Sequence, residues 1–208
     1  MNERKTGPRA YRSSARTRAA QATRGNIVEA AGALLREKGV AGFSLDAVAK
    51  QAGVTRLTVY NQFGTRRALL EAVFDDRAEK GGMHRLAAAA GMADARAALH
   101  QVIAIFCNFW SVDHALVEDL HYVGSADLDF QVSMRERNER RRKLLKVLIV
   151  RMAGRAIAHP KRLDGLVDLL FVLTGFPVYA ELARDRSKNA VCDLITEVAD
   201  DLVKRMLA

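Results

Sequence analysis

Residues 43–74, which read FSLDAVAKQAGVTRLTVYNQFGTRRALLEAVF, constrain the fold of this chain more than any other stretch. Two short amphipathic segments, Ser44–Ala52 and Thr55–Phe63, are joined through Gly53. A glycine between two short helices is typical of a helix-turn-helix. The sequence therefore predicts this motif, with a second helix that enters a groove of DNA.

The ends of the two predicted helices have the residues that such ends require. Ser44 and Thr55 are suited to cap the helix N-termini, and Gly53 accepts the left-handed conformation that often follows a helix. The first segment has one inward face, since its apolar residues recur at spacings of three and four. That face consists of Leu45, Val48, Ala49 and Ala52.

The second segment has an outward face that suits a DNA groove. Arg and Asn side chains hydrogen-bond to base edges, a Thr offers a hydroxyl or a methyl group, and a Tyr reaches a phosphate. A helical hairpin with a solvated polar face remains the alternative for the motif alone. The outward residues are Arg56, Leu57, Thr58, Tyr60 and Asn61.

The positive charge is concentrated near this motif. The chain carries a net charge of +9, and residues 1–80 hold 15 basic and 8 acidic side chains, so most of the excess lies there. Such clustering is expected of a protein that binds a phosphate backbone. Residues 1–22 form a basic arm without an apolar run, and we expect them to be disordered. They either enter a minor groove or make no specific contact.

The chain after residue 24 reads almost entirely as helix, and no alternating pattern supports a sheet. We expect an all-α protein with a three-helix DNA-binding domain over residues 23–80 and a larger helical domain over residues 83–208. The helices predicted there include Asp94–Val112, the shorter His114–Val123, the long Asp127–Ala158 and Leu163–Arg184. The charged segment Arg135–Lys143 is interpreted as a solvated helix face.

The sequence also indicates the compartment. No stretch reaches the roughly 18 apolar residues of a membrane span, and the basic N-terminus lacks the apolar core of a secretory signal. Cys107 and Cys192 are far apart in the sequence and lie in apolar helical patterns, which argues against a disulfide scaffold. We therefore expect a cytoplasmic protein that does not bind membranes.

The block from about Thr23 to Phe74 resembles the tetracycline-repressor (TetR) family. The resemblance rests on the glycine at 39 and on the motifs Phe43-Ser44, Val48-Ala49, Ala52-Gly53-Val54, Val59-Tyr60, Phe63 and Ala68-Leu69-Leu70. It covers about a quarter of the chain. Two residues depart from the family pattern, because Leu57 replaces a small residue and Arg67 replaces a frequent Glu.

The resemblance implies which side chains contact DNA. Thr55, Tyr60 and the Thr65-Arg66 pair would contact phosphates, and Arg67 adds a charge that favours phosphate. Base edges would face the outward set of the second helix. The full set of expected DNA-binding residues is Ser44, Thr55, Arg56, Leu57, Thr58, Tyr60, Asn61, Thr65, Arg66 and Arg67.

The resemblance further implies a C-terminal domain that forms a homodimer and often holds a small-molecule pocket. The dimer would be built from Leu163–Arg184 and Asn189–Leu207, which have more apolar surface than one chain covers. Each candidate pocket residue has a place in the core as its alternative role. The candidates are Phe106, Trp110, His121, Tyr122, Phe130, Met134, Phe171, Thr174 and Tyr179.

The function expected from the sequence is a dimeric regulator that binds a palindromic operator in double-stranded DNA and acts as a repressor released by a hydrophobic or aromatic effector. A DNA-binding regulator without a ligand is the first alternative. An all-helical enzyme is the second, although the five histidines are scattered and no pair has metal-ligand spacing. We expect no catalytic residue, metal site or cofactor.

Overall fold

A computed structural model describes residues 8–126, 128–154 and 160–207, and within these ranges the secondary structure is helical without a strand. The all-α class predicted from the sequence is confirmed. The chain divides into two compact units between Val73 and Phe74. Helix α4 (Arg66–Lys80) is continuous across that division.

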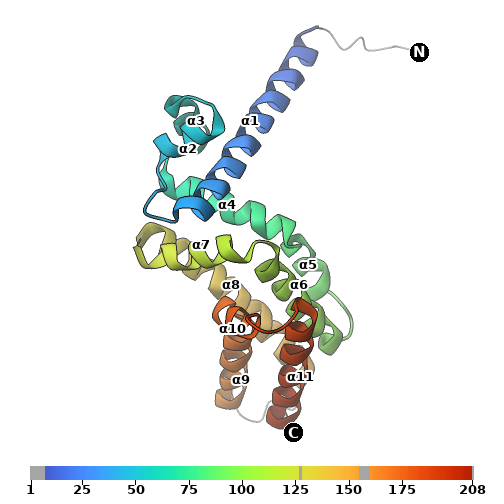
Figure 1. Cartoon of the computed structure of the whole chain (residues 1–208). Helices are drawn as coiled ribbons and strands as arrows, with labels where there is room; N and C mark the ends of the chain where they lie inside the picture. The colour runs from blue at the N-terminus through green and yellow to red at the C-terminus, as the bar shows by residue number, and fades with distance from the viewer. Residues whose placement is uncertain (1–7, 127, 155–159, 208) are drawn as a thin grey trace, which may run out of the picture. The chain divides into compact units, whose positions relative to one another are not determined.

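The N-terminal unit consists of α1 (Pro8–Lys38), α2 (Leu45–Ala52), α3 (Arg56–Phe63) and the first half of α4 (Figure 1). The joint between α2 and α3 has the predicted chemistry. The Ser44 and Thr55 hydroxyls accept from the backbone N–H groups of Ala47 and Thr58, both at 3.1 Å. Gly53 takes φ 66°, which is the left-handed region that a residue with a side chain avoids.

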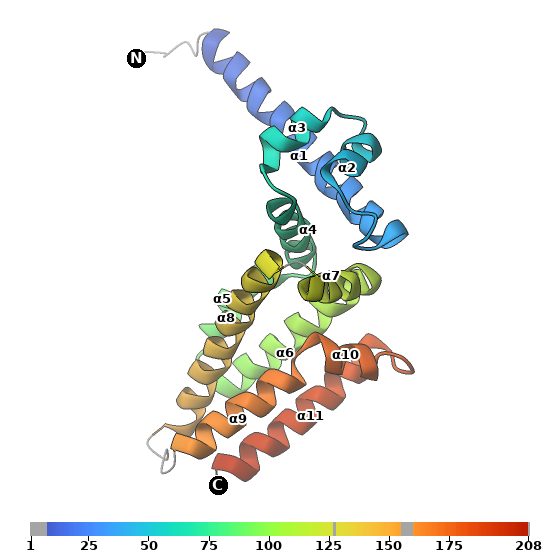
Figure 2. The same ribbon diagram turned by 90° about the vertical axis from the view of Figure 1, so that its left-hand side faces the viewer.

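Helix α1 begins at Pro8, so the predicted disorder of residues 1–22 is wrong from Pro8 onward, and residues 1–7 lie outside the described ranges. Proline is favoured at the first helical position, where its missing N–H group is not needed. Alanine, arginine and glutamine are good helix formers, and they dominate the segment up to Ala22. The N-terminal part of α1 projects past α2 and α3 (Figures 1 and 2).

Helix α1 holds the helix-turn-helix in place through its C-terminal half. Ile27, Leu34 and Leu35 are fully or almost fully buried. The Asn26 amide donates to the Ala52 carbonyl at 2.9 Å, at the end of α2. Arg24 donates to the carbonyl of Gln62 at 2.8 Å and lies 4.2 Å from the centre of the Phe63 ring.

The C-terminal unit begins with the second half of α4 and continues through a short 3-10 helix and seven α-helices. α6, α8, α9 and α11 pack around a shared core, with α9 and α11 side by side (Figure 2). The helices are η1 (Met83–Arg85), α5 (Leu86–Ala90), α6 (Ala95–Val112), α7 (His114–Ala126), α8 (Leu128–Ala153), α9 (Pro160–Leu173), α10 (Phe176–Leu182) and α11 (Lys188–Leu207).

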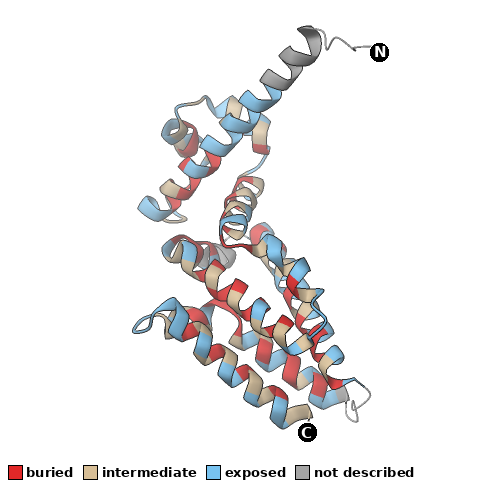
Figure 3. Ribbon diagram, turned by 90° about the vertical axis from the view of Figure 1, so that its right-hand side faces the viewer, coloured by how far each residue is buried: buried red, intermediate tan, exposed pale blue. Residues whose placement is uncertain are grey.

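The core of this unit follows the apolar spacing of its helices. Buried positions concentrate on the sides of the helices that face one another (Figure 3). α11 contributes one face at spacings of four, and Ser187 caps its start by accepting from the Ala190 N–H group at 3.3 Å. The buried α11 residues are Val191, Ile195, Ala199 and Val203.

The predicted helix Leu163–Arg184 is interrupted, which corrects the sequence interpretation. α9 ends at Leu173, and α10 starts at Phe176 after a bend of 51°. Pro177 explains the break, because proline lacks an N–H group and suits only the first turn of a new helix. In the described residues, no single helix has both the length and the apolar composition of a membrane span, and only the bent pair α9 and α10 reaches them together.

Candidate functional site

Helix α3 has a buried face and an exposed face, as the sequence predicts. Val59 is fully buried and Phe63 is 8% exposed. On the opposite side Leu57 is 66% exposed, Tyr60 is 57% exposed and Asn61 is also exposed. Large apolar and aromatic side chains are seldom left this open without a partner surface. The exposed face of α3 therefore offers a surface for binding.

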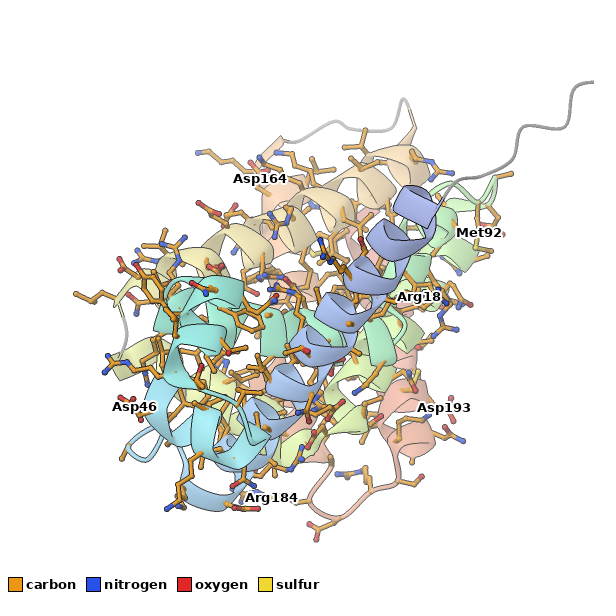
Figure 4. All side chains as sticks on the ribbon, turned by 90° about the horizontal axis from the view of Figure 1, so that it is seen from above. Arg18, Asp46, Met92, Asp164, Arg184 and Asp193 are labelled. Atoms are coloured by element: carbon orange, nitrogen blue, oxygen red, sulfur yellow. The ribbon has the colours of Figure 1, made fainter. Side chains whose placement is uncertain are left out.

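Two other outward residues of α3 have partners inside the N-terminal unit. Arg56 lies 3.4 Å from the carboxylate of Asp46, and both side chains are mostly exposed. Asp46 projects from the outer side of α2 (Figure 4). The Thr58 hydroxyl is half-buried and lies 2.8 Å from the hydroxyl of Thr55. Arg56 is thus held at the surface, whereas Thr58 is partly occupied by the cap of its own helix.

At the start of α4, Arg66 and Arg67 have different surroundings, although both were expected to contact phosphates. Thr65 caps α4 by accepting from the Ala68 N–H group at 3.0 Å. Arg66 turns toward the loop before α2 and donates to the carbonyls of Phe43 and Val40 at 3.3 and 3.4 Å. Arg67 is exposed and pairs with Glu71 at 2.9 Å. Arg66 therefore braces the loop, and Arg67 presents its charge at the surface.

The C-terminal unit contains two mainly apolar cavities that share part of their walls. The larger has a volume of about 490 Å³ and the smaller about 320 Å³. Both are within or near the size range of small-molecule sites. They share Phe74, Trp110, Arg137 and Asn138. A third hollow, beside Arg96 and Arg151, has a larger volume but is more polar and more open to solvent.

Four of the nine predicted ligand residues line these cavities. Phe106 lines the larger, His121 and Met134 line the smaller, and Trp110 lines both. The side chain of Tyr122 lies outside the described part of the structure. The remaining four contribute to the core or to the cavity's support and do not line either cavity; they are Phe130, Phe171, Thr174 and Tyr179.

The interpretation of Arg135–Lys143 as a solvated face is wrong for Arg141, which is only 8% exposed. Its guanidinium donates to the Thr174 carbonyl at 2.6 Å and lies 4.2 Å from the centre of the Phe171 ring. Arg137, Arg141 and Leu145 recur every four residues and so share one side of α8. That spacing, continued by the buried Leu148, is the sequence signal for an inward arginine.

Arg137 lies beside Arg141 on α8 and contacts the second half of α4. It forms an ion pair with Asp75 at 2.5 Å and lies 4.8 Å from the centre of the Phe74 ring. Because Phe74, Asp75, Ala78 and Glu79 also line the larger cavity, one wall of that cavity is α4 itself. A molecule bound there would touch the helix that continues into the N-terminal unit.

The two cysteines, distant in sequence, meet between α6 and α11. Both are free, with Cys107 buried and Cys192 half-buried. A hydrogen bond from Cys107 lowers the pKa of Cys192 to about 7, while the same bond and burial raise the pKa of Cys107. This contact is not predictable from the sequence alone, because it depends on how two helices pack. In the described residues, no group of three or more potential ligands is placed to hold a metal ion.

Comparison with known proteins shows a family resemblance in the N-terminal unit. Residues 27–73 match the model of the bacterial regulatory proteins of the tetR family. The matched segment contains the joint, the exposed face of α3 and the first half of α4. No curated protein matches the sequence.

Solved structures share the fold over most of the chain. A TetR-like transcriptional regulator from Rhodococcus sp. RHA1 is 18% identical, with a TM-score of 0.67 over 88% of this chain and 94% of its own. NalD, the secondary repressor of the MexAB-OprM multidrug efflux pump in Pseudomonas aeruginosa, is 21% identical, with a TM-score of 0.65 over 88% and 96%.

A third structure, the multidrug binding protein EbrR complexed with imidazole, is 20% identical, with a TM-score of 0.57 over 86% of this chain and 88% of its own. At these identities the likeness is one of fold. The family resemblance comes from the N-terminal unit, where the sequence itself matches. Over residues 27–73, this chain is similar to the bacterial regulatory proteins of the tetR family.

Proposed function

We propose that this protein is a homodimeric transcriptional regulator that reads a palindromic operator through α3 and is released from it by a small ligand. The main support for this proposal is the exposed face of α3, where Leu57, Tyr60 and Asn61 point outward. The opposite face, with Val59 and Phe63, is buried and fixes the helix. A helix presented in this way suits the major groove.

The roles of the exposed residues follow from their chemistry. Tyr60 and Arg67 reach phosphates, together with the capping hydroxyls of Ser44, Thr55 and Thr65. Arg56 and Asn61 bond to base edges, and Leu57 contacts a thymine methyl group. The Arg56–Asp46 pair does not prevent this, because an ion pair so exposed contributes little and exchanges readily for DNA. Thr58 adds its methyl group, and Arg66 acts by bracing the loop.

The dimer face is assigned to α9 and α11. Leu169 and Val172 on α9 are 48% and 60% exposed, and Val198 on α11 is 37% exposed. These apolar side chains are exposed on two helices that pack against each other, so two copies could bury them in a four-helix bundle. A two-fold dimer presents two copies of α3 to two half-sites, about 34–36 Å apart on DNA.

Release by a ligand is supported by the larger cavity, which α4 lines. A ligand shifts the equilibrium only when it binds one conformation better than the other. Because Phe74 and Asp75 belong to α4, a ligand in the cavity contacts the one helix that continues into the DNA-binding unit. The fold neighbour EbrR, a multidrug binding protein with imidazole bound, is consistent with such a site.

The proposal is tested by selecting sites from random DNA duplexes with the full-length protein and measuring binding by fluorescence anisotropy. We expect a palindrome to be enriched. Tyr60→Ala should weaken binding to every sequence, and Arg56→Ala should change the preference at one position by about 1–3 kcal/mol. Val147→Ala, which alters an exposed α8 residue, serves as the control.

Two results would contradict parts of the proposal. If no sequence is enriched and Tyr60→Ala binds as the wild type does, DNA is not the partner of α3. If the operator is bound but a panel of neutral and charged aromatic compounds never releases it, the protein is a regulator without a ligand.

A further inference from the structure

The charge of the ligand can be inferred from two arginines at the larger cavity, an inference that rests on the ligand-responsive function proposed above. Arg137 and Arg141 lie one turn apart on α8, and both line this cavity. In each, the Nε–H group is buried and has no hydrogen-bond acceptor among the described residues. A buried donor without an acceptor is costly, and such groups often mark a place where a ligand binds.

Arg141 is the more unusual of the two, since the groups around it carry no negative charge. Its terminal nitrogens donate to the Thr174 carbonyl at 2.6 Å, to the Thr174 hydroxyl at 3.4 Å and to the Asn138 side-chain oxygen at 3.4 Å. The ring of Phe171 covers one face of the guanidinium. Buried charges are ordinarily paired, so this one lacks a counter-ion within the described structure.

The acids of the cavity wall do not supply that counter-ion. Asp75 pairs with Arg137 at 2.5 Å, and Glu79 pairs with His84 at 3.1 Å. Burial, reinforced by the charge of neighbouring Arg142, lowers the pKa of Arg141 to about 10. Because this value is still well above neutral pH, Arg141 remains a cation.

The rest of the cavity is apolar. Its wall includes Phe106, Phe109, Trp110, Met83 and Leu144, which offer aromatic and aliphatic contact to a ligand body. A volume of about 490 Å³ accommodates a small organic molecule with one or two rings or a medium aliphatic chain. The site therefore combines an apolar chamber with one positively charged end.

We propose that the effector is an amphipathic monoanion, whose carboxylate accepts from the Nε–H groups of Arg141 and Arg137 and whose apolar body lies against Phe106 and Trp110. A carboxylate matches the planar guanidinium and forms short, charge-assisted hydrogen bonds. The carboxylate also supplies the negative counter-ion that Arg141 lacks. Neutral and cationic compounds of the same shape would leave the buried charge uncompensated.

A purely structural role for Arg141 would be to satisfy the Thr174 carbonyl just after the end of α9. That carbonyl already accepts from the indole N–H group of Trp110 at 3.1 Å, so it keeps a partner when Arg141 is replaced. An uncompensated buried charge is destabilising, so its replacement by an apolar side chain removes that cost. Arg141→Met should therefore fold, with a thermal midpoint no lower than that of the wild type.

The experiment uses three probes of one shape, 2-naphthoate, 2-naphthamide and 2-naphthylmethylammonium, titrated calorimetrically into the full-length protein. We expect 2-naphthoate to bind about 10- to 100-fold more tightly than 2-naphthamide, and the ammonium compound to bind most weakly. Arg141→Met should abolish the advantage of the anion and leave the affinity for the amide unchanged. Lys143→Met, which removes an exposed charge from the same helix, should retain the wild-type preference.

Arg141→Lys provides a second test if Arg141→Met does not fold. It keeps the charge but loses the planar fork, so it should bind 2-naphthoate with intermediate affinity. Equal binding of the amide and the anion by wild-type protein would overturn the inference, and release of DNA by the amide would leave the proposed function standing. If no probe binds while the operator is still bound, the inference is overturned, and the wider panel described above decides separately whether any ligand releases DNA.

Discussion

Arg137 joins the cavity to α4 by pairing with Asp75 at 2.5 Å while its guanidinium covers the ring of Phe74. Since Asp75 is 59% exposed, this ion pair contributes little to stability. Its position matters more, because the same arginine lines both cavities. The pair is therefore a candidate for transmitting ligand binding to the DNA-binding unit.

The first prediction concerns this pair. Asp75→Asn should leave the fold and the operator affinity intact and should bind an anionic ligand at least as tightly, because Arg137 no longer shares its charge. The ligand should release DNA less effectively, with a coupling about fivefold smaller, or roughly 1 kcal/mol. Anisotropy titrations with and without ligand measure both quantities. Glu181→Gln, which breaks an exposed pair with Arg184 and lies outside the cavity wall, should behave as the wild type does. An Asp75→Asn variant with full coupling would contradict this role.

The second prediction separates two neighbouring arginines. Arg66→Ala should lower the free energy of unfolding by about 1–2 kcal/mol, because the carbonyls of Val40 and Phe43 lose a charged donor. Arg67→Ala should cost about 0.5 kcal/mol or less, since the ion pair with Glu71 that it removes lies at the surface.

The DNA-binding data should show the reverse order for these variants. Arg67→Ala should reduce the slope of log affinity against log salt by about one, as expected for one lost phosphate contact. Denaturant unfolding and anisotropy over a salt series provide the two measurements. A reduced slope for Arg66→Ala, without loss of stability, would return Arg66 to the phosphate role that the sequence suggested.

The third prediction concerns the dimer. Val172→Glu on α9 and Val198→Glu on α11 should each place a charge in the interface and give monomers with weak operator binding. Val147→Glu on α8 is a matched control, since Val147 is 53% exposed and lies outside the assigned face. Sedimentation velocity at micromolar concentration distinguishes the two states. Wild-type protein that sediments as a monomer would rule out the assigned dimer.

The fourth prediction follows from the cysteine pair. Because a hydrogen bond from Cys107 lowers the pKa of Cys192 to about 7, the Cys192 thiolate should form as pH rises through 7. The rate of alkylation by iodoacetamide should rise with a midpoint near that pH, since the thiolate is the nucleophile. Cys107→Ala removes the donor and should move the midpoint upward. Cys192→Ala should abolish the fast reaction, whereas a wild-type midpoint near 9, the usual value, would show that the bond has no such effect.

The sequence predicted the features that depend on neighbouring residues. The caps at Ser44 and Thr55 form as expected, because each satisfies an N–H group three residues away. The inward face of α2 and the outward face of α3 also follow from local spacing. These features together confirm the all-α class and the joint at Gly53.

The features that the sequence did not predict depend on distant contacts. The burial of Arg141 requires α9 to end where its Thr174 carbonyl meets the guanidinium. The meeting of Cys107 and Cys192 requires α6 to pack against α11. Among the candidate ligand residues, the sequence could not separate those that line a cavity from those in the core, because aromatic side chains serve both purposes.

The bend between α9 and α10 has a consequence for how two subunits would share a signal. α9 carries Leu169 and Val172 of the assigned dimer face, and the carbonyl just beyond its C-terminus holds Arg141 at the cavity. In the proposed dimer, a ligand that draws Arg141 toward itself would pull on the end of a helix that the partner subunit also contacts. The occupancy of one cavity would then alter the affinity of the other, and effector titrations of the dimer would show a Hill coefficient different from one.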